Sequence, residues 1–270
     1  MKIYNVQMII SQQSADENYL TAEKWIRKAG EEGADVVVLP ELWNTAFHMD
    51  ENVIRLADVD GLRTQEFLSG LAKEYHMNIV GGSVTVKEGD RLYNRSYIYN
   101  REGELIETYD KVHLFSYVKE ENYFERGSKP GIFELDGHKC GIVICYDTRF
   151  LEWVRLYALA GVEVLFSVAE WPIKRLPHWK SILQTRAIEN QFFVSGTNFA
   201  SLKVNGKFAG ESAVYDPWGV RISETLEEEG LVVGEVDFSR LEEIRSTINV
   251  YRDRRTDLYD VVAKDSRLFG

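Results

Sequence analysis

Cys145 stands at the end of a short apolar run, where its thiol could act as a nucleophile. Residues 141–144 read as a buried strand, and a helix is predicted to begin near Asp147 or Thr148. A strand, a sharp turn and a helix form a nucleophile elbow, which holds a side chain beside the N–H groups of a helix N-terminus. Such groups favour a thiolate and can hold an oxyanion. Taken alone, Cys145 would fit a buried and inert cysteine better, since cysteine is among the most buried residues.

Two charged residues follow other predicted strands in the same way. Glu41 comes directly after the apolar run 36–40, and Lys111 comes just after the predicted strand 104–109. Each one alone would fit an exposed charged side chain, but sheet enzymes place functional groups at the carboxyl ends of strands. Together the three residues predict acyl transfer. Glu41 would take the thiol proton, Lys111 would stabilise the oxyanion, and Cys145 would carry the acyl group as a thioester.

Helices and strands alternate along the chain in the pattern that must position these residues. Helices are predicted over residues 16–32, 63–76, 149–160, 179–190 and 239–245. Strands are predicted over residues 2–10, 35–39, 78–86, 92–100, 104–109, 132–135, 139–144, 163–169, 191–198, 209–215 and 231–237. No linker or repeat interrupts them, so residues 1–270 are expected to form one α/β domain. So many strands require two mixed sheets packed face to face, with helices on the outer faces.

The composition and charge limit the partners of this chain. Of its 270 residues, 44% are hydrophobic, and the formal net charge is −11. Phosphate binding needs a basic surface, so we expect no nucleic-acid partner. No apolar run reaches the roughly 18 residues that span a bilayer, and the first residues do not read as a signal peptide. We therefore expect no membrane association and a cytoplasmic location.

The cysteines and histidines predict neither a disulfide nor a metal site. Cys140 and Cys145 lie five residues apart in one predicted strand, so their side chains face opposite sides of the sheet and cannot pair. The spacing fits no zinc motif, and the five histidines are scattered along the chain. The acyl-transfer chemistry proposed above needs no cofactor, and none is expected.

Several short motifs together resemble the nitrilase superfamily of carbon–nitrogen hydrolases. They are Leu-Pro-Glu at 39–41, Tyr-Asp-Lys-Val-His-Leu-Phe at 109–115, Ile-Cys-Tyr-Asp-Thr-Arg-Phe at 144–150, Arg-Ala-Ile-Glu-Asn-Gln at 186–191, and a run at 208–219. Their joint order and spacing are specific. The resemblance implies a four-layer α-β-β-α sandwich with a core over about residues 2–240. It also implies a homodimer, with the helix after Cys145 and the segment 241–270 at the contact.

The resemblance implies a second glutamate in the loop after Lys111, and Glu120 and Glu121 are the two candidates. We favour Glu121, because residues 121–127 resemble the usual Glu-x-Tyr-Phe-x-x-Gly run. Many members have Pro-Glu soon after His-Leu-Phe, whereas residues 116–119 here are Ser-Tyr-Val-Lys, so the alignment leaves Glu120 open. The expected role of Glu121 is to help position the substrate and Lys111.

Residues 170–179 resemble the ω-amidase branch of this superfamily, with its Trp-Pro-x-x-Arg-x-x-His-Trp pattern. That branch hydrolyses the terminal amide of 2-oxo-dicarboxylic acid monoamides, such as 2-oxoglutaramate and 2-oxosuccinamate. These substrates carry a carboxylate, which the planar guanidinium of Arg175 could hold with two hydrogen bonds. Trp171 is expected to form an apolar wall, and the backbone N–H of Tyr146 to hold the oxyanion. Phe115 is a further expected substrate contact.

Arg149 is a second arginine near the predicted site, four residues after Cys145. By family resemblance, and because Asp147 is near, we expect Arg149 to order the elbow rather than to hold a substrate anion. The sequence thus predicts one main carboxylate-binding residue, Arg175.

Three other functions remain open at this level. The chain could be an amidase of the same superfamily that acts on N-carbamoyl compounds or simple aliphatic amides, which the segment around Arg175 disfavours. It could be a non-catalytic binding protein on the same fold, although such a protein has no need of all three of the predicted catalytic residues. It could be a redox sensor that uses Cys145, but no resolving cysteine is predicted on the same face.

Overall fold

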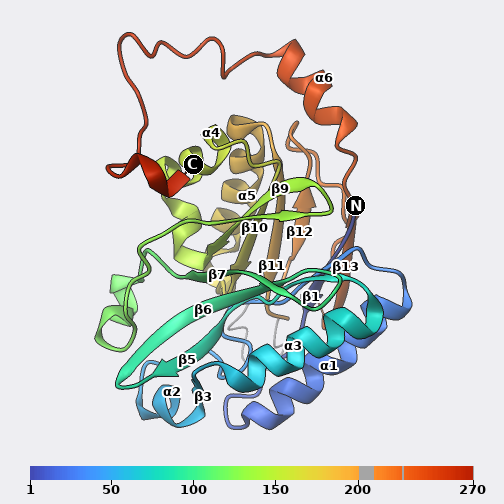
Figure 1. Ribbon diagram of the computed structural model, residues 1–270, viewed down its shortest axis with the longest axis vertical. Helices are drawn as coiled ribbons and strands as arrows, with labels where there is room; N and C mark the ends of the chain where they lie inside the picture. The colour runs from blue at the N-terminus through green and yellow to red at the C-terminus, as the bar shows by residue number, and fades with distance from the viewer. Residues whose placement is uncertain (201–209, 227, 270) are drawn as a thin grey trace.

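Two β-sheets form the centre of the protein (Figure 1). The computed structural model describes residues 1–200, 210–226 and 228–269. Within them the larger sheet has eight strands: β1 (Lys2–Gln7), β2 (Val36–Val38), β3 (Asp58–Val59), β4 (Asn78–Val80), β5 (Val84–Glu88), β6 (Arg91–Tyr99), β7 (Leu105–Asp110) and β13 (Gly230–Glu235). The smaller sheet has five: β8 (Gly131–Leu135), β9 (His138–Ile144), β10 (Val164–Ala169), β11 (Phe193–Asn198) and β12 (Ala213–Tyr215).

The interior of the larger sheet is parallel, and helices join its strands. β1, β2 and β4 run in the same direction, with α1 (Ala15–Glu31) between β1 and β2 and α3 (Leu62–Tyr75) leading into β4. α1 begins where the Ser14 hydroxyl accepts a hydrogen bond from the N–H of Glu17, which satisfies one free donor of the first turn. β2 lies between β1 and β4, so Glu41 follows a strand in the middle of the sheet.

The smaller sheet repeats this arrangement. β9, β10 and β11 are parallel, and α4 (Leu151–Leu159) and α5 (Leu176–Asn190) connect them. Cys145 follows β9 directly and Glu170 follows β10. Both side chains therefore stand at the carboxyl edge of this sheet, where parallel strands bring functional groups together.

Alternating side chains separate the layers. Val36 and Val38 of β2 belong to the apolar core between the two sheets, whereas Val37 packs in the core that α1 and α3 cover. On the outer side of the smaller sheet, Leu165 and Leu183 belong to a third core beneath α4 and α5. The order helix, sheet, sheet, helix confirms the predicted four-layer sandwich (Figure 1).

Short elements differ from the sequence prediction. α2 (Glu51–Leu56) and β3 were not predicted, because six and two residues are too short to show a periodic pattern. α5 begins three residues before its predicted start. Within the predicted strand 209–215, the described strand is β12, and Ala209 lies outside the described residues, as does Phe208 of the run at 208–219.

The C-terminal segment crosses the molecule. After α6 (Ser239–Thr247) the chain runs as an irregular segment that returns to α4 (Figure 1). There the ring of Phe269 packs edge-on against Trp153 and Tyr157, with centroid distances of 5.3 and 5.6 Å. None of the described helices is long and apolar enough to cross a lipid bilayer.

Candidate active site

Glu41, Lys111 and Cys145 follow strands of both sheets and meet at one place. Lys111 Nζ donates a hydrogen bond to Glu41 Oε1 at 2.8 Å, and Glu41 and Lys111 are the charged groups with the largest effects on the pKa of the Cys145 thiol. The Glu41 side chain is fully buried, and the Lys111 side chain is 1% exposed. The structure therefore brings the expected thiol, carboxylate and ammonium together, with Glu41 and Lys111 buried and Cys145 half-buried at the wall of a pocket.

Cys145 sits on a strained turn. Its φ of +48° is a backbone conformation that residues with a side chain rarely adopt and that costs about 1–3 kcal/mol. The sequence predicted a helix directly after this turn, but residues Cys145–Arg149 form a 3₁₀ helix, and α4 begins only at Leu151. The N–H groups closest to the thiol thus belong to this tight turn rather than to the first turn of an α-helix.

Three donors hold the Glu41 carboxylate in place. Oε1 accepts from Lys111 Nζ and, at 3.0 Å, from Asn94 Nδ2, and Oε2 accepts from the backbone N–H of Glu170 at 2.9 Å. Asn94 lies on β6 and also donates to Glu120 at 3.4 Å, while its backbone oxygen accepts from the N–H of Lys111. Sequence reasoning missed Asn94, because an asparagine inside a predicted strand carries no signal of its own.

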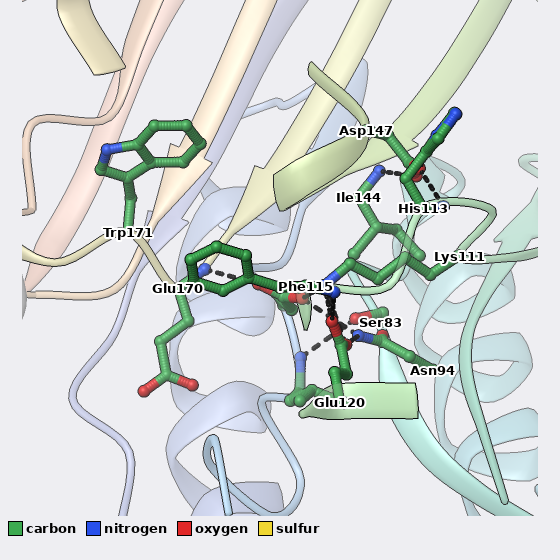
Figure 2. Close-up of polar contacts among 12 residues, drawn as sticks. Ser83, Asn94, Lys111, His113, Phe115, Glu120, Ile144, Asp147, Glu170 and Trp171 are labelled. Carbon is green, nitrogen blue, oxygen red and sulfur yellow. Dashed lines mark hydrogen bonds and ion pairs between the residues drawn. The ribbon is translucent and has the colours of Figure 1, made fainter. Parts of the chain in front are cut away.

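The preference for Glu121 is corrected to Glu120. Both Glu120 oxygens accept from Lys111 Nζ, at 2.9 and 3.0 Å, and the N–H of Phe115 donates to Oε2 at 2.6 Å. Glu120 is fully buried, whereas Glu121 is exposed. Glu120 opens the 3₁₀ turn Glu120–Asn122, and no spacing in the sequence distinguishes it from Glu121. Figure 2 shows Glu120, Asn94 and Lys111 pointing toward one another.

Burial and these neighbours set the charges in the cluster. Burial lowers the pKa of Lys111, but Glu120 and Glu41 outweigh it and hold that pKa well above its ordinary value. Burial and the Glu41 charge raise the pKa of Cys145 well above its ordinary value, against a smaller opposing effect of Lys111. Burial also raises the pKa of Glu120, and Lys111 opposes it. At neutral pH the resting site therefore holds a protonated lysine and a neutral thiol.

A pocket opens above Cys145, and its space is about 680 Å³ including the open mouth. We call it the substrate pocket. Its lining consists of Phe47, Lys111, Phe115, Val118, Cys145, Tyr146, Arg149, Glu170, Trp171, Pro172 and Arg175. All four of the expected substrate contacts are among these residues. The rings of Phe115 and Tyr146 lie 4.7 Å apart, and the indole N–H of Trp171 donates to the backbone oxygen of Arg175 at 2.9 Å.

The expectation that Arg149 orders the elbow is wrong. The Asp147 carboxylate accepts its hydrogen bonds from Tyr109, His113 and Ile144. Arg149 instead lines the substrate pocket with its guanidinium 4.4 Å from the Trp171 ring, and burial together with the charge of Arg175 lowers its pKa. The sequence could not reveal this, because two of the residues that bind Asp147, Tyr109 and His113, lie more than 30 residues away along the chain.

Arg175 is the second guanidinium of the pocket. It lies over the ring of Phe115 at 5.2 Å and near Tyr117 at 5.9 Å, so aromatic faces hold it as they hold Arg149. In the described part of the chain, no group of three or more His, Cys, Asp or Glu residues could hold a metal ion. The site thus combines a thiol, a lysine and two buried glutamates with a pocket that carries two arginines.

Comparisons with known sequences show which proteins this chain is similar to. Residues 5–246 match the family described as carbon–nitrogen hydrolase. A 2-oxoglutaramate amidase of Bacillus subtilis is 45% identical over 254 residues, which cover 94% of this chain and 97% of the relative. The omega-amidase NIT2 of Homo sapiens is 32% identical over 268 residues, which cover 96% of each chain.

A solved structure has the same architecture. Nit3 of Saccharomyces cerevisiae, described as a member of branch 10 of the nitrilase superfamily, superimposes with a TM-score of 0.87 at 29% identity. The match covers 94% of this chain and 96% of the other. The likeness supports the nitrilase-like arrangement of the two sheets and their outer helices.

Proposed function

This chain belongs to the carbon–nitrogen hydrolase family, and we propose that it hydrolyses the terminal amide of 2-oxo-dicarboxylic acid monoamides. Substrates of this class include 2-oxoglutaramate and 2-oxosuccinamate, and the products are the oxo-acid and ammonia. The observation that carries the proposal is the pairing of a buried Cys145–Glu41–Lys111 cluster with a pocket that contains Arg149 and Arg175. The names of the relatives given above support the same substrate class.

The first half of the reaction forms a thioester. Glu41, the charged group that acts most strongly on the Cys145 thiol, removes the thiol proton as the sulfur attacks the amide carbon. Lys111 Nζ has three N–H bonds. One points to Glu41 and one is shared by the two oxygens of Glu120, which leaves one for the oxyanion. The backbone N–H of Tyr146 is the second oxyanion donor. Glu41 then protonates the leaving ammonia.

The second half restores the thiol. A water molecule enters where ammonia left, and Glu41 takes its proton as the oxygen attacks the thioester carbon. Lys111 and Tyr146 stabilise the second oxyanion, the C–S bond breaks, and the Cys145 sulfur regains a proton from Glu41. Glu120 keeps Lys111 charged and oriented through both halves. No step of this scheme requires a cofactor or a metal ion.

The two guanidiniums explain the preference for a substrate with a carboxylate. Arg149 and Arg175 line the wall that also holds Trp171, and both are positively charged groups in a largely apolar pocket. A carboxylate neutralises their mutual repulsion and gains charge-assisted hydrogen bonds. Simple aliphatic amides would leave these groups unpaired, so the pocket disfavours them as substrates.

Ammonia release from purified protein tests the proposal. We expect turnover of 2-oxoglutaramate at a much higher kcat/KM than of glutamine, propionamide or N-carbamoyl-β-alanine, and none with Cys145→Ala. Preferred hydrolysis of propionamide or of the carbamoyl compound would refute the substrate class. Full ammonia release by Cys145→Ala would refute the thioester scheme, and inactivity of the wild type on all four compounds would favour a binding protein.

We further propose a homodimer and a cytoplasmic location. The outer helices α4 and α5 of the smaller sheet and the turn after β12 expose the apolar side chains of Leu151, Ile188, Trp218 and Val220. A second copy would cover them, with the segment 241–270 at the same contact. Both cysteines are free thiols, which suits a reducing compartment. Light scattering after gel filtration tests the dimer, since a monomer at micromolar concentration would contradict it.

A further inference from the structure

The Asp147 carboxylate, two residues after the nucleophile, is fully buried and accepts four hydrogen bonds. Oδ1 accepts from the backbone N–H of His113 at 2.8 Å and from His113 Nδ1 at 2.7 Å. Oδ2 accepts from the Tyr109 hydroxyl at 2.7 Å and from the backbone N–H of Ile144 at 3.0 Å. Because a carboxylate can only accept, Nδ1 of His113 must carry a proton.

The residues that supply these four donors lie close in sequence to Lys111 and Cys145. Tyr109 and His113 stand two residues before and two residues after Lys111, and Ile144 directly precedes Cys145. Figure 2 shows Asp147 between His113 and Ile144, with dashed lines to both. The Asp147 carboxylate thus binds both the segment that contains Lys111 and the strand end that precedes Cys145.

The two segments that Asp147 binds belong to different sheets. Lys111 follows β7 of the larger sheet, as Glu41 follows β2, whereas Cys145 follows β9 of the smaller sheet. The nucleophile and its two activating groups therefore depend on the relative placement of the sheets at this edge. Apolar packing between sheets is not directional, but hydrogen bonds to a buried carboxylate are.

We propose that Asp147 is the positioning residue that holds the lysine loop in register with the strained cysteine turn. It touches neither substrate nor reacting atoms, and it acts through Lys111 and Cys145. A misplacement of about 1 Å between reacting groups can cost about 100-fold in rate. The inference rests on the proposed function, since it assigns Lys111 and Cys145 their roles.

Asp147→Asn is the main test. The amide has nearly the shape of the carboxylate, but its NH₂ group cannot accept a hydrogen bond. The two bonds to one of the former carboxylate oxygens are therefore lost, and the NH₂ group faces N–H or O–H donors instead of accepting from them. We expect kcat for 2-oxoglutaramate to fall about 100-fold. KM should stay within about twofold, because the residues of the substrate pocket that bind the carboxylate are unchanged.

Asp136→Asn is the matched control. Asp136, on the turn between β8 and β9 of the smaller sheet, accepts hydrogen bonds from Arg101 and Asn78 of the larger-sheet side at the other end of β9. It is thus also an aspartate that ties the two sheets together, but far along β9 from Cys145. We expect Asp136→Asn to lower the melting temperature and to leave kcat unchanged.

Two milder variants keep the test decisive if Asp147→Asn does not fold. His113→Ala loses the ring hydrogen bond and keeps the backbone one, and Tyr109→Phe loses a single hydroxyl. We expect kcat to fall about tenfold and about threefold respectively, as smaller fractions of the 100-fold effect. In the Asp147→Asn background, His113→Ala should add little, since the partner oxygen is already impaired.

A second reaction separates failure of this inference from failure of the proposed substrate. Acylation of Cys145 by p-nitrophenyl acetate, whose acyl group has no carboxylate, should slow in Asp147→Asn in parallel with kcat. If the wild type does not hydrolyse 2-oxoglutaramate, the substrate proposal fails. The ratio of the acylation rates of Asp147→Asn and wild type still tests the role of Asp147. The inference is overturned if folded Asp147→Asn acylates and turns over within about threefold of wild type. The inference is also overturned if the rate of Asp147→Asn falls only in proportion to the loss of folded protein in that variant.

Discussion

The catalytic cluster and the substrate pocket meet at Cys145 but are built in opposite ways. In the cluster, made of Glu41, Asn94, Lys111, Glu120 and Cys145, the buried side chains of the first four residues hold one another through hydrogen bonds of 2.8–3.0 Å. In the pocket, the charged groups Arg149 and Arg175 lie on aromatic rings at 4.4 and 5.2 Å. A buried network has one arrangement and suits a fixed reaction, whereas a cation on a ring can turn toward an arriving anion. The difference assigns the chemistry to the cluster and the choice of substrate to the pocket.

Glu41→Gln should have the largest effect, because it removes the only proton acceptor proposed for both halves of the reaction. We expect kcat to fall at least about 10³-fold and KM for 2-oxoglutaramate to change little, since the pocket is intact. Steady-state ammonia release measures both constants. A variant that loses affinity rather than rate would show that the cluster also selects substrate, which would break the division between the two regions.

Glu120→Gln and Glu121→Gln form the next pair. Glu120 binds the Lys111 ammonium with both oxygens. When Glu120 loses its charge, Lys111 pairs more tightly with Glu41, and Glu41 becomes a weaker base. We expect kcat to fall about 100-fold, a typical cost for one displaced electrostatic group. The exposed Glu121 should change kcat by less than twofold. Equal effects of the two variants would contradict the corrected assignment of the second glutamate.

Arg149→Met and Arg175→Met address the pocket. Each variant removes a charge-assisted hydrogen bond worth about 1.5–3 kcal/mol, which corresponds to a rise in KM for 2-oxoglutaramate of about 10- to 100-fold. The kcat at saturation should stay within about threefold of wild type. Propionamide, which lacks a carboxylate, is the control substrate, and its kcat/KM should not fall. A loss of kcat on both substrates would place these arginines in the catalytic cluster instead.

What the sequence could predict follows from backbone direction. Glu41, Lys111 and Cys145 each come at or just after a strand end, and parallel strands carry such positions to a common edge whatever the side chains do. The four layers were implied by the resemblance to the nitrilase superfamily, and the alternating direction of side chains along strands such as β2 explains which core each valine enters.

Single side-chain directions were not predictable in the same way. Glu120 rather than Glu121 points inward because Lys119 adopts a left-handed conformation, with φ of +57°, just before the turn. One residue of difference on a tight turn exchanges the buried and the exposed side chain. Arg149 enters the pocket because Tyr109 and His113, from the other sheet, already occupy Asp147. Both outcomes depend on tertiary contacts that no local pattern encodes.

The smallest expected effect is on the pKa of the Cys145 thiol without substrate, and it follows from the negative charge of Glu41. Glu41 raises the pKa of Cys145, because a negative carboxylate disfavours a thiolate beside it. Glu41→Gln removes that charge and leaves Lys111, whose effect on the thiol is opposite, so the pKa of Cys145 should fall by at least about one pH unit. Ultraviolet absorbance of the thiolate across a pH titration measures it, with Cys145→Ala as the blank. The same Glu41→Gln variant is expected to hydrolyse almost no amide. Its Cys145 would therefore be more ionised than in the wild type but less active in hydrolysis. An unchanged titration midpoint would mean that burial alone sets the resting state of the thiol, and that Glu41 acts only once substrate has filled the pocket.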